Sequence, residues 1–250
     1  MAQLYGGAIR ESLEQKWLIA AAELKEAEAE AERRRADGIQ FFMLKVGSRP
    51  LDQDVRLTRA LRNILGDRLR LCADANGAWT RPQAAKYLND VADCDLVYLE
   101  QPLASDKLDD AAELAASVST PLSLDECVAS TEDIRVAWAA RATCGAVIKS
   151  SKFGGLWQSL QAGTACEALK LKVALATPMA ESSIGTAAAL QVSAVLPHVE
   201  WEIAPSSDYL AEDLVEVPIR HAAGRLPVPS GPGVGVQVDR RLVDRFRLDR

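Results

Sequence analysis

The sequence is poor in histidine, in paired cysteines and in long apolar runs. Its 250 residues include two histidines, His198 and His221, and five cysteines that form no CxxC pair. Reduced thiols are therefore expected, and a zinc site or a disulfide framework is not. No apolar run approaches the roughly 20 residues of a membrane span, and the N-terminus lacks the basic-then-apolar layout of a signal peptide. These absences predict a cytoplasmic protein with no membrane partner.

Basic residues are fewer than acidic ones, 29 against 35. The chain has a net charge of −6 and a pI of about 5.1, whereas a nucleic-acid partner would need a basic patch. We therefore expect no nucleic-acid partner. The GxSxG motif of serine hydrolases is missing, and neither histidine is placed to serve Ser182 and Ser183, which makes a serine hydrolase improbable.

Short apolar runs alternate with longer helical patterns along the chain. Strands are expected at residues 4–8, 40–46, 69–74, 96–100, 121–125, 145–149, 172–176 and 200–203. Helices are expected at 12–36, 51–66, 80–92, 107–117, 131–141, 155–168 and 182–196. This alternation and the chain length predict an α/β fold, a (β/α) TIM-type barrel. We expect one domain over 1–250, with the barrel at about 4–205 and a Pro- and Gly-rich extended segment at about 206–250 that packs across it.

Charged residues end five of the expected strands. Asp74, Glu100 and Asp125 close three successive runs, and Lys45 and Lys149 close the runs on either side. The C-terminal ends of barrel strands meet at one face, where active sites are built. Three carboxylates in one place repel one another unless a cation neutralises them. Oxygen ligands favour a hard ion, so the sequence predicts a Mg²⁺ site.

The two lysines would lie on opposite sides of a substrate bound at this metal. A desolvated lysine beside a metal loses its proton readily enough to act as a base. Two opposed amines can remove a proton from one face of a carbon atom and return it to the other. The metal would stabilise the enediolate that forms when the α-proton of a carboxylate leaves.

Five short motifs in this order resemble those of the enolase superfamily, and specifically of its muconate-lactonizing subgroup. They are LKVG (44–47), ADANGAW (73–79), LEQP (99–102), LDE (124–126) and IKSSKFGGL (148–156). The resemblance covers residues 4 to 238. It implies that Asp74, Glu100 and Asp125 bind Mg²⁺, that Lys45 and Lys149 are the acid/base pair, and that the barrel can assemble into a homo-oligomer.

The resemblance also suggests residues around the substrate. Asn76 and Glu126 are expected beside the metal ligands, and Glu181 near the substrate at the end of the seventh strand. Glu202 or Asp208 would meet a substrate ammonium group. The seventh strand carries no histidine, which disfavours a mandelate-racemase-type site.

Two departures from the subgroup pattern stand out. Met43 replaces the first lysine of the subgroup's Lys-x-Lys pattern, an auxiliary cation near the substrate carboxylate. The usual N-terminal α+β capping domain is also expected to be lacking, because the sequence starts at the first barrel strand.

Three functions remain open. The leading expectation is a racemase or epimerase of an amino-acid derivative, such as an N-acyl amino acid, a dipeptide or a proline analogue. The second is a dehydratase, an o-succinylbenzoate synthase or a muconate-type cycloisomerase. The third is a cap-less barrel that binds metal or a partner without turnover. The first two share a small-molecule carboxylate substrate.

Overall fold

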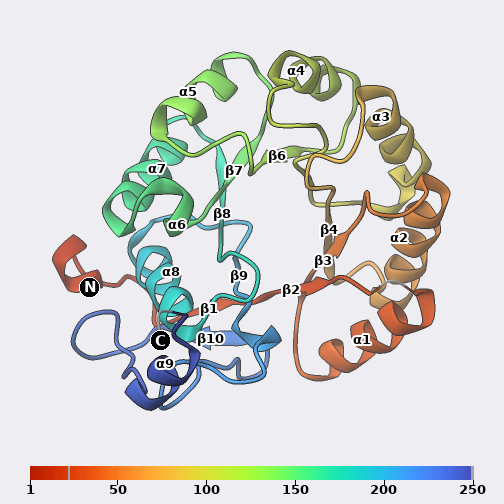
Figure 1. The fold of residues 1–250 in the computed structure, drawn as a ribbon. Coiled ribbons are helices and arrows are strands. Elements are labelled where there is room, and N and C mark those ends of the chain that lie inside the picture. Colours follow the sequence, from red (N-terminus) through yellow and green to blue (C-terminus); the bar gives the residue numbers. More distant parts are fainter. Residues whose placement is uncertain (22, 249–250) are drawn as a thin grey trace.

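Eight parallel strands form a closed barrel in the computed structural model, which describes residues 1–21 and 23–248. The strands pair in chain order, and helices surround them (Figure 1). A parallel bridge between Gln15 and Ile203 joins the last strand to the first. The barrel strands are β2 (Lys16–Ile19), β3 (Phe41–Lys45), β4 (Arg70–Asp74), β5 (Leu99–Glu100), β6 (Leu122–Leu124), β7 (Gly145–Ile148), β8 (Lys172–Ala176) and β9 (Ile203–Ala204). The predicted (β/α) barrel is thus confirmed.

The helices begin at residues that suit helix N-termini. Thr80 and Gln83 form a capping box, Ser130 accepts a hydrogen bond from the Asp133 amide, and Ser182 accepts one from Ile184. The helices are α1 (Leu24–Ala36), α2 (Leu51–Leu65), α3 (Arg81–Asp90), α4 (Leu108–Ser117), α5 (Thr131–Ala139), α6 (Ser150–Phe153), α7 (Leu156–Ala168), α8 (Ser183–Val195) and α9 (Arg240–Phe246). None of the helices that the structure describes is long and apolar enough to cross a membrane.

The expected first strand and first helix are wrong. Residues 4–8 do not form a strand, and the segment 12–36 is not one helix. Instead β1 (Ser12–Glu14) and β2 precede α1. Polar residues before Trp17 gave the segment a helical pattern, but pairing with β3 in the barrel outweighs that local preference.

The C-terminal segment returns to the N-terminal residues. Its strand β10 (Arg225–Pro227) pairs antiparallel with β1. The Gln191 side chain, on α8, accepts a hydrogen bond from the Ala2 amide and donates to the carbonyls of Pro229 and Val234. The N-terminal residues and the segment 229–234 therefore both pack against α8 (Figure 1).

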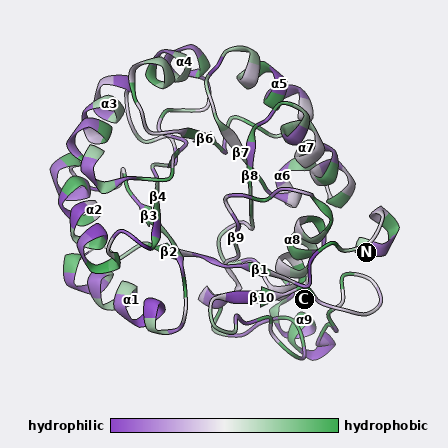
Figure 2. Ribbon diagram, turned by 180° about the vertical axis from the view of Figure 1, so that it is seen from behind, coloured by the Kyte–Doolittle hydropathy of each residue, from purple (hydrophilic) through white to green (hydrophobic). Residues whose placement is uncertain are grey.

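The strands separate two apolar regions. Alternate residues point outward and pack under the helices, whose hydrophilic and hydrophobic residues are interspersed along the outer ring (Figure 2). The other residues fill the barrel interior, where a smaller cluster contains Phe41, Met43, Cys72, Tyr98, Val147, Ala174, Ala176 and Trp201. The interior is a packed core, not a pore.

Gly145, the first residue of β7, leaves room for this interior. A methyl group there would overlap the Lys172 carbonyl oxygen and the Trp201 ring. We predict that Gly145→Ala lowers the free energy of unfolding by about 1–3 kcal/mol, because a backbone carbonyl cannot give way. Chemical denaturation would measure it.

Gly185→Ala is the matched control. Its added methyl would meet the end of the partly exposed Glu181 side chain, which can move away, and alanine favours the helix α8. A loss at Gly145 no larger than the loss at Gly185 would contradict the prediction.

Candidate functional site

The alternation of side chains along each strand brings the predicted charged residues together. On β3, Phe41 and Met43 point into the barrel, so Lys45 follows them at the mouth. On β4, Asp74 follows Cys72 in the same way, and on β5 Glu100 follows Tyr98. Each strand thus supplies an apolar residue to the interior and a charged residue to its C-terminal end.

The three carboxylates lie at the ends of neighbouring strands, and all are buried. Asp74 and Asp125 are each 1% exposed and Glu100 is 3% exposed. Asp74 and Glu100 are directly paired in the β4–β5 register. Burial of several carboxylates in one place requires nearby positive charge.

Lysines supply that charge to the two aspartates. Lys45 donates a hydrogen bond to Asp74, and Lys149 and Lys152 both donate to Asp125. Lys45 also donates to the Asn76 side-chain oxygen at 2.9 Å. The Asn76 side-chain nitrogen in turn donates to the Glu126 carboxylate at 2.9 Å. The expected supporting residues Asn76 and Glu126 therefore join the same network.

Glu100 differs from the two aspartates because no lysine contacts it. Its Oε2 atom is buried and has no hydrogen-bond partner among the described residues. Burial, and then the negative charge of Asp74, raise the pKa of Glu100 to about 8. A cation placed beside Glu100 would oppose both effects, because it favours the charged carboxylate.

The ion pair between Lys149 and Asp125 shifts the pKa values of its two members in opposite directions. Burial alone would raise the pKa of Asp125, but the ammonium groups of Lys152 and Lys149 outweigh it and lower that pKa. Burial alone would lower the pKa of Lys149, but Asp125 outweighs it and raises that pKa. Both shifts favour the charged forms.

The donor set suits a hard divalent cation. Asp74, Glu100 and Asp125 offer oxygen atoms from adjacent strand ends, and Glu100 has a buried oxygen without a partner. In the part of the chain that the structure describes, no three His, Cys, Asp or Glu side chains are already in position to hold a metal ion. The three carboxylates would therefore have to move closer together to hold a metal ion.

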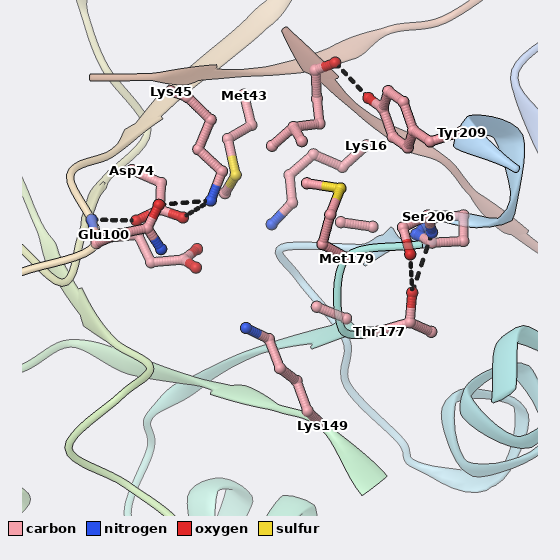
Figure 3. A pocket seen from close by; sticks show the side chains of 15 residues that line it. Lys16, Met43, Lys45, Asp74, Glu100, Lys149, Thr177, Met179, Ser206 and Tyr209 are labelled. Atoms are coloured by element: carbon pink, nitrogen blue, oxygen red, sulfur yellow. Dashed lines mark hydrogen bonds and ion pairs between the residues drawn. The ribbon is translucent and has the colours of Figure 1, made fainter. Parts of the chain in front are cut away.

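A pocket of about 290 Å³ opens beside these residues. Figure 3 shows Lys45 and Lys149 reaching into it from opposite sides, with Asp74 and Glu100 at one edge. Met43 lines the pocket, as do Met179 and Tyr209 from the loops after β8 and β9. The pocket thus combines titratable groups with an apolar wall, as small-molecule sites do.

Three residues expected near the substrate make their contacts with other groups of the protein. Glu181 accepts hydrogen bonds from the amide and hydroxyl of Ser182. Glu202 precedes β9 and forms an ion pair with Arg70, the first residue of β4, so it lies at the other end of the barrel. Asp208 accepts a hydrogen bond from Gln15 and pairs with Arg220 at 3.4 Å. None of the three lines the pocket.

Two lysines of the site were not predicted. Lys16 lines the pocket from β2, and Lys152 holds Asp125 from α6. Lys152 lies one helical turn after Lys149 in the IKSSKFGGL motif, so its spacing could have been used. The sequence pattern of residues 12–36 indicates a helix, so it does not place Lys16 on a barrel strand.

Comparisons with known proteins agree with this fold. Residues 26–242 match the family described as enolase C-terminal domain-like. The chain is 31% identical over 252 residues to muconate cycloisomerase 1-2 of Acinetobacter lwoffii, covering all of this chain and 65% of that protein. It is 33% identical over 219 residues to an o-succinylbenzoate synthase of Geobacillus kaustophilus, covering 86% of this chain and 56% of that protein.

A solved structure shows the same architecture. The muconate cycloisomerase of Pseudomonas fluorescens superposes with a TM-score of 0.93 at 26% identity, over 99% of this chain and 69% of that one. The chain thus spans about two thirds of the length of the cycloisomerases it matches. A barrel of this size with acidic and lysine residues at its mouth defines an enolase-type domain, and the chain belongs to the enolase superfamily, in the muconate-lactonizing subgroup.

The raised pKa of Glu100 predicts how stability depends on pH without metal. Between about pH 4.5 and about pH 8 the folded state keeps a proton on Glu100 that the unfolded state has released. The free energy of unfolding should therefore fall as pH rises through this range. Urea unfolding in EDTA measures this slope.

Glu100→Gln is the matched variant, because it has no carboxyl group to titrate. We expect a smaller fall across the same pH range in Glu100→Gln. Equal slopes in the two proteins would show that Glu100 is not the group responsible.

Proposed function

We propose that this chain forms the catalytic barrel of a Mg²⁺-dependent enzyme that transfers a proton at the carbon next to a substrate carboxylate. The observation that carries this proposal is the position of Lys45 and Lys149 on opposite sides of one pocket, with three buried carboxylates between their strands (Figure 3). Two opposed amines next to a cation site suit acid/base chemistry at a carbon atom.

The proposed reaction is a cycloisomerisation of a muconate-type dicarboxylate. The similarity to muconate cycloisomerases in both sequence and structure supports it. These comparisons favour it over the racemisation or epimerisation of an amino-acid derivative that the sequence suggested. The o-succinylbenzoate synthase relative supports o-succinylbenzoate synthesis as a second candidate reaction.

Ring closure forms one C–O bond and one C–H bond. A carboxylate oxygen of the substrate adds to the conjugated double bond, and a lysine gives a proton to the carbon next to the other carboxylate. Because the pKa of Lys149 is raised, its ammonium form is favoured and holds a proton at Nζ. Lys45 faces the same space from the other side and would serve the opposite face.

The other residues of the site hold these groups in place. A bound Mg²⁺ ion would oppose the negative charge that develops on the reacting carboxylate. Asp74, Glu100 and Asp125 would hold it. Asn76 orients Lys45, and Lys152 fixes Asp125 by contacting both its side chain and its backbone carbonyl.

We predict that alanine at either lysine removes or redirects proton transfer. With Mg²⁺ and cis,cis-muconate, loss of ultraviolet absorbance reports closure of the conjugated diene. At least one of Lys45→Ala and Lys149→Ala should lose about 10²-fold or more in kcat, the contribution expected of a positioned acid or base.

Lys107→Ala, at an exposed lysine before α4, is the control and should retain activity. Full activity in both site variants would refute the assignment of the lysines. Binding of Mg²⁺ without turnover of muconate or an o-succinylbenzoate precursor would favour a barrel that binds metal or a partner only.

A second prediction concerns the metal. Asp125→Asn should weaken Mg²⁺ binding by at least about tenfold, since even groups that only support metal ligands contribute that much. Titration calorimetry measures the affinity, and Asp109→Asn on the exposed side of α4 serves as the control. Unchanged affinity in Asp125→Asn would remove Asp125 from the ligand set.

A further inference from the structure

Lys16 is a buried cation inside the barrel to which the proposed acid/base chemistry gives no role. It is the first residue of β2 and is 1% exposed. Its ammonium group donates a hydrogen bond to the Tyr98 hydroxyl and lies 5.1 Å from the centre of the Tyr98 ring and 5.5 Å from that of Phe41. None of the ion pairs formed by the described residues includes Lys16. A buried ammonium group without an anion is costly, so a role for it is expected.

The ammonium group faces the same pocket as the site. Figure 3 shows Lys16 reaching into the space between Lys45, Lys149 and Glu100. Leu18 and Met43 are register partners on β2 and β3, and both line this side of the pocket. Lys16 is therefore a charged donor on an otherwise apolar wall.

Lys16 differs from the other two lysines that line the pocket. Lys45 and Lys149 each donate a hydrogen bond to an aspartate, Asp74 and Asp125. Lys16 contacts no carboxylate among the described residues and donates only to the Tyr98 hydroxyl. Its ammonium group is therefore the one in the pocket that is left to pair with a negative charge on a ligand.

We propose that Lys16 is a specificity-determining residue that binds the second carboxylate of a dicarboxylate substrate on the floor of the pocket. The first carboxylate would lie at the cation site, between Lys45 and Lys149. This inference rests on the proposed function, because that function places the reacting carboxylate. Met43 on β3 carries no charge, so the positive charge on this side of the pocket comes from Lys16 on β2.

A comparison of a dianion with its monoester tests the proposal. Titration calorimetry with the Mg²⁺-loaded protein would measure binding of adipate, the saturated analogue of muconate that has no double bond to react, and of its monomethyl ester. The wild-type protein should prefer the dianion by about tenfold or more, the effect of one hydrogen bond to a charged group. Lys16→Met should reduce this preference to less than about threefold, and Lys16→Gln should do the same.

Lys172→Met is the matched control. Lys172 is also the first residue of a barrel strand and has its ammonium group over an aromatic ring, Trp201, but it is exposed. Its variant should keep the wild-type preference. Circular dichroism would establish that each variant is folded.

Three results would overturn the role of Lys16. One is a wild-type protein that does not prefer the dianion, including one that binds neither probe. Another is a preference that survives in both Lys16 variants. The third is a loss of Mg²⁺ affinity in Lys16→Met with the ligand preference intact, which would show that Lys16 acts through Glu100. Lys16-dependent preference without ring closure would contradict the proposed reaction and support the inference.

Discussion

The balance of charge at the buried mouth of the barrel is the constraint on which the site depends. Three carboxylates with almost no exposure lie at neighbouring strand ends, and their repulsion must be offset. Lys45, Lys149 and Lys152 offset it at the two aspartates, whereas Glu100 has no cation in contact. The lysines thus offset the aspartate charges, and Glu100 is the carboxylate at which a bound cation would add most to this balance.

The barrel makes this arrangement rigid. Parallel strands in register hold Lys45, Asp74, Glu100 and Lys149 each two positions beyond an apolar interior residue, and backbone hydrogen bonds fix the spacing between the strands. Loops after β8 and β9 complete the pocket with Met179 and Tyr209. The strand ends thus carry the chemistry, and the loops form the part of the wall that can differ between relatives.

Sequence patterns could predict the strand ends but not every side-chain position. The charged residues after apolar runs were found because a barrel brings such positions to one face. The first strand was missed because Glu14, Gln15 and Lys16 precede Trp17 and resemble a helix, and Lys16 was missed with it. Glu202 lies at the opposite end because β9 begins three residues later than the expected strand at 200–203. A shift of three residues is small in the sequence, but it exchanges the two ends of a short strand.

Deuterium exchange into muconolactone, followed by proton NMR in D₂O, tests the central claim most directly. The account predicts that one of the two protons on the carbon next to the carboxylate is replaced, that replacement requires Mg²⁺, and that only one face of the carbon is affected. Exchange at one face follows because the proton is given and taken by one of the two lysines, which reaches the carbon from one side of the pocket. A folded protein that binds both Mg²⁺ and the lactone but exchanges neither proton would contradict the account.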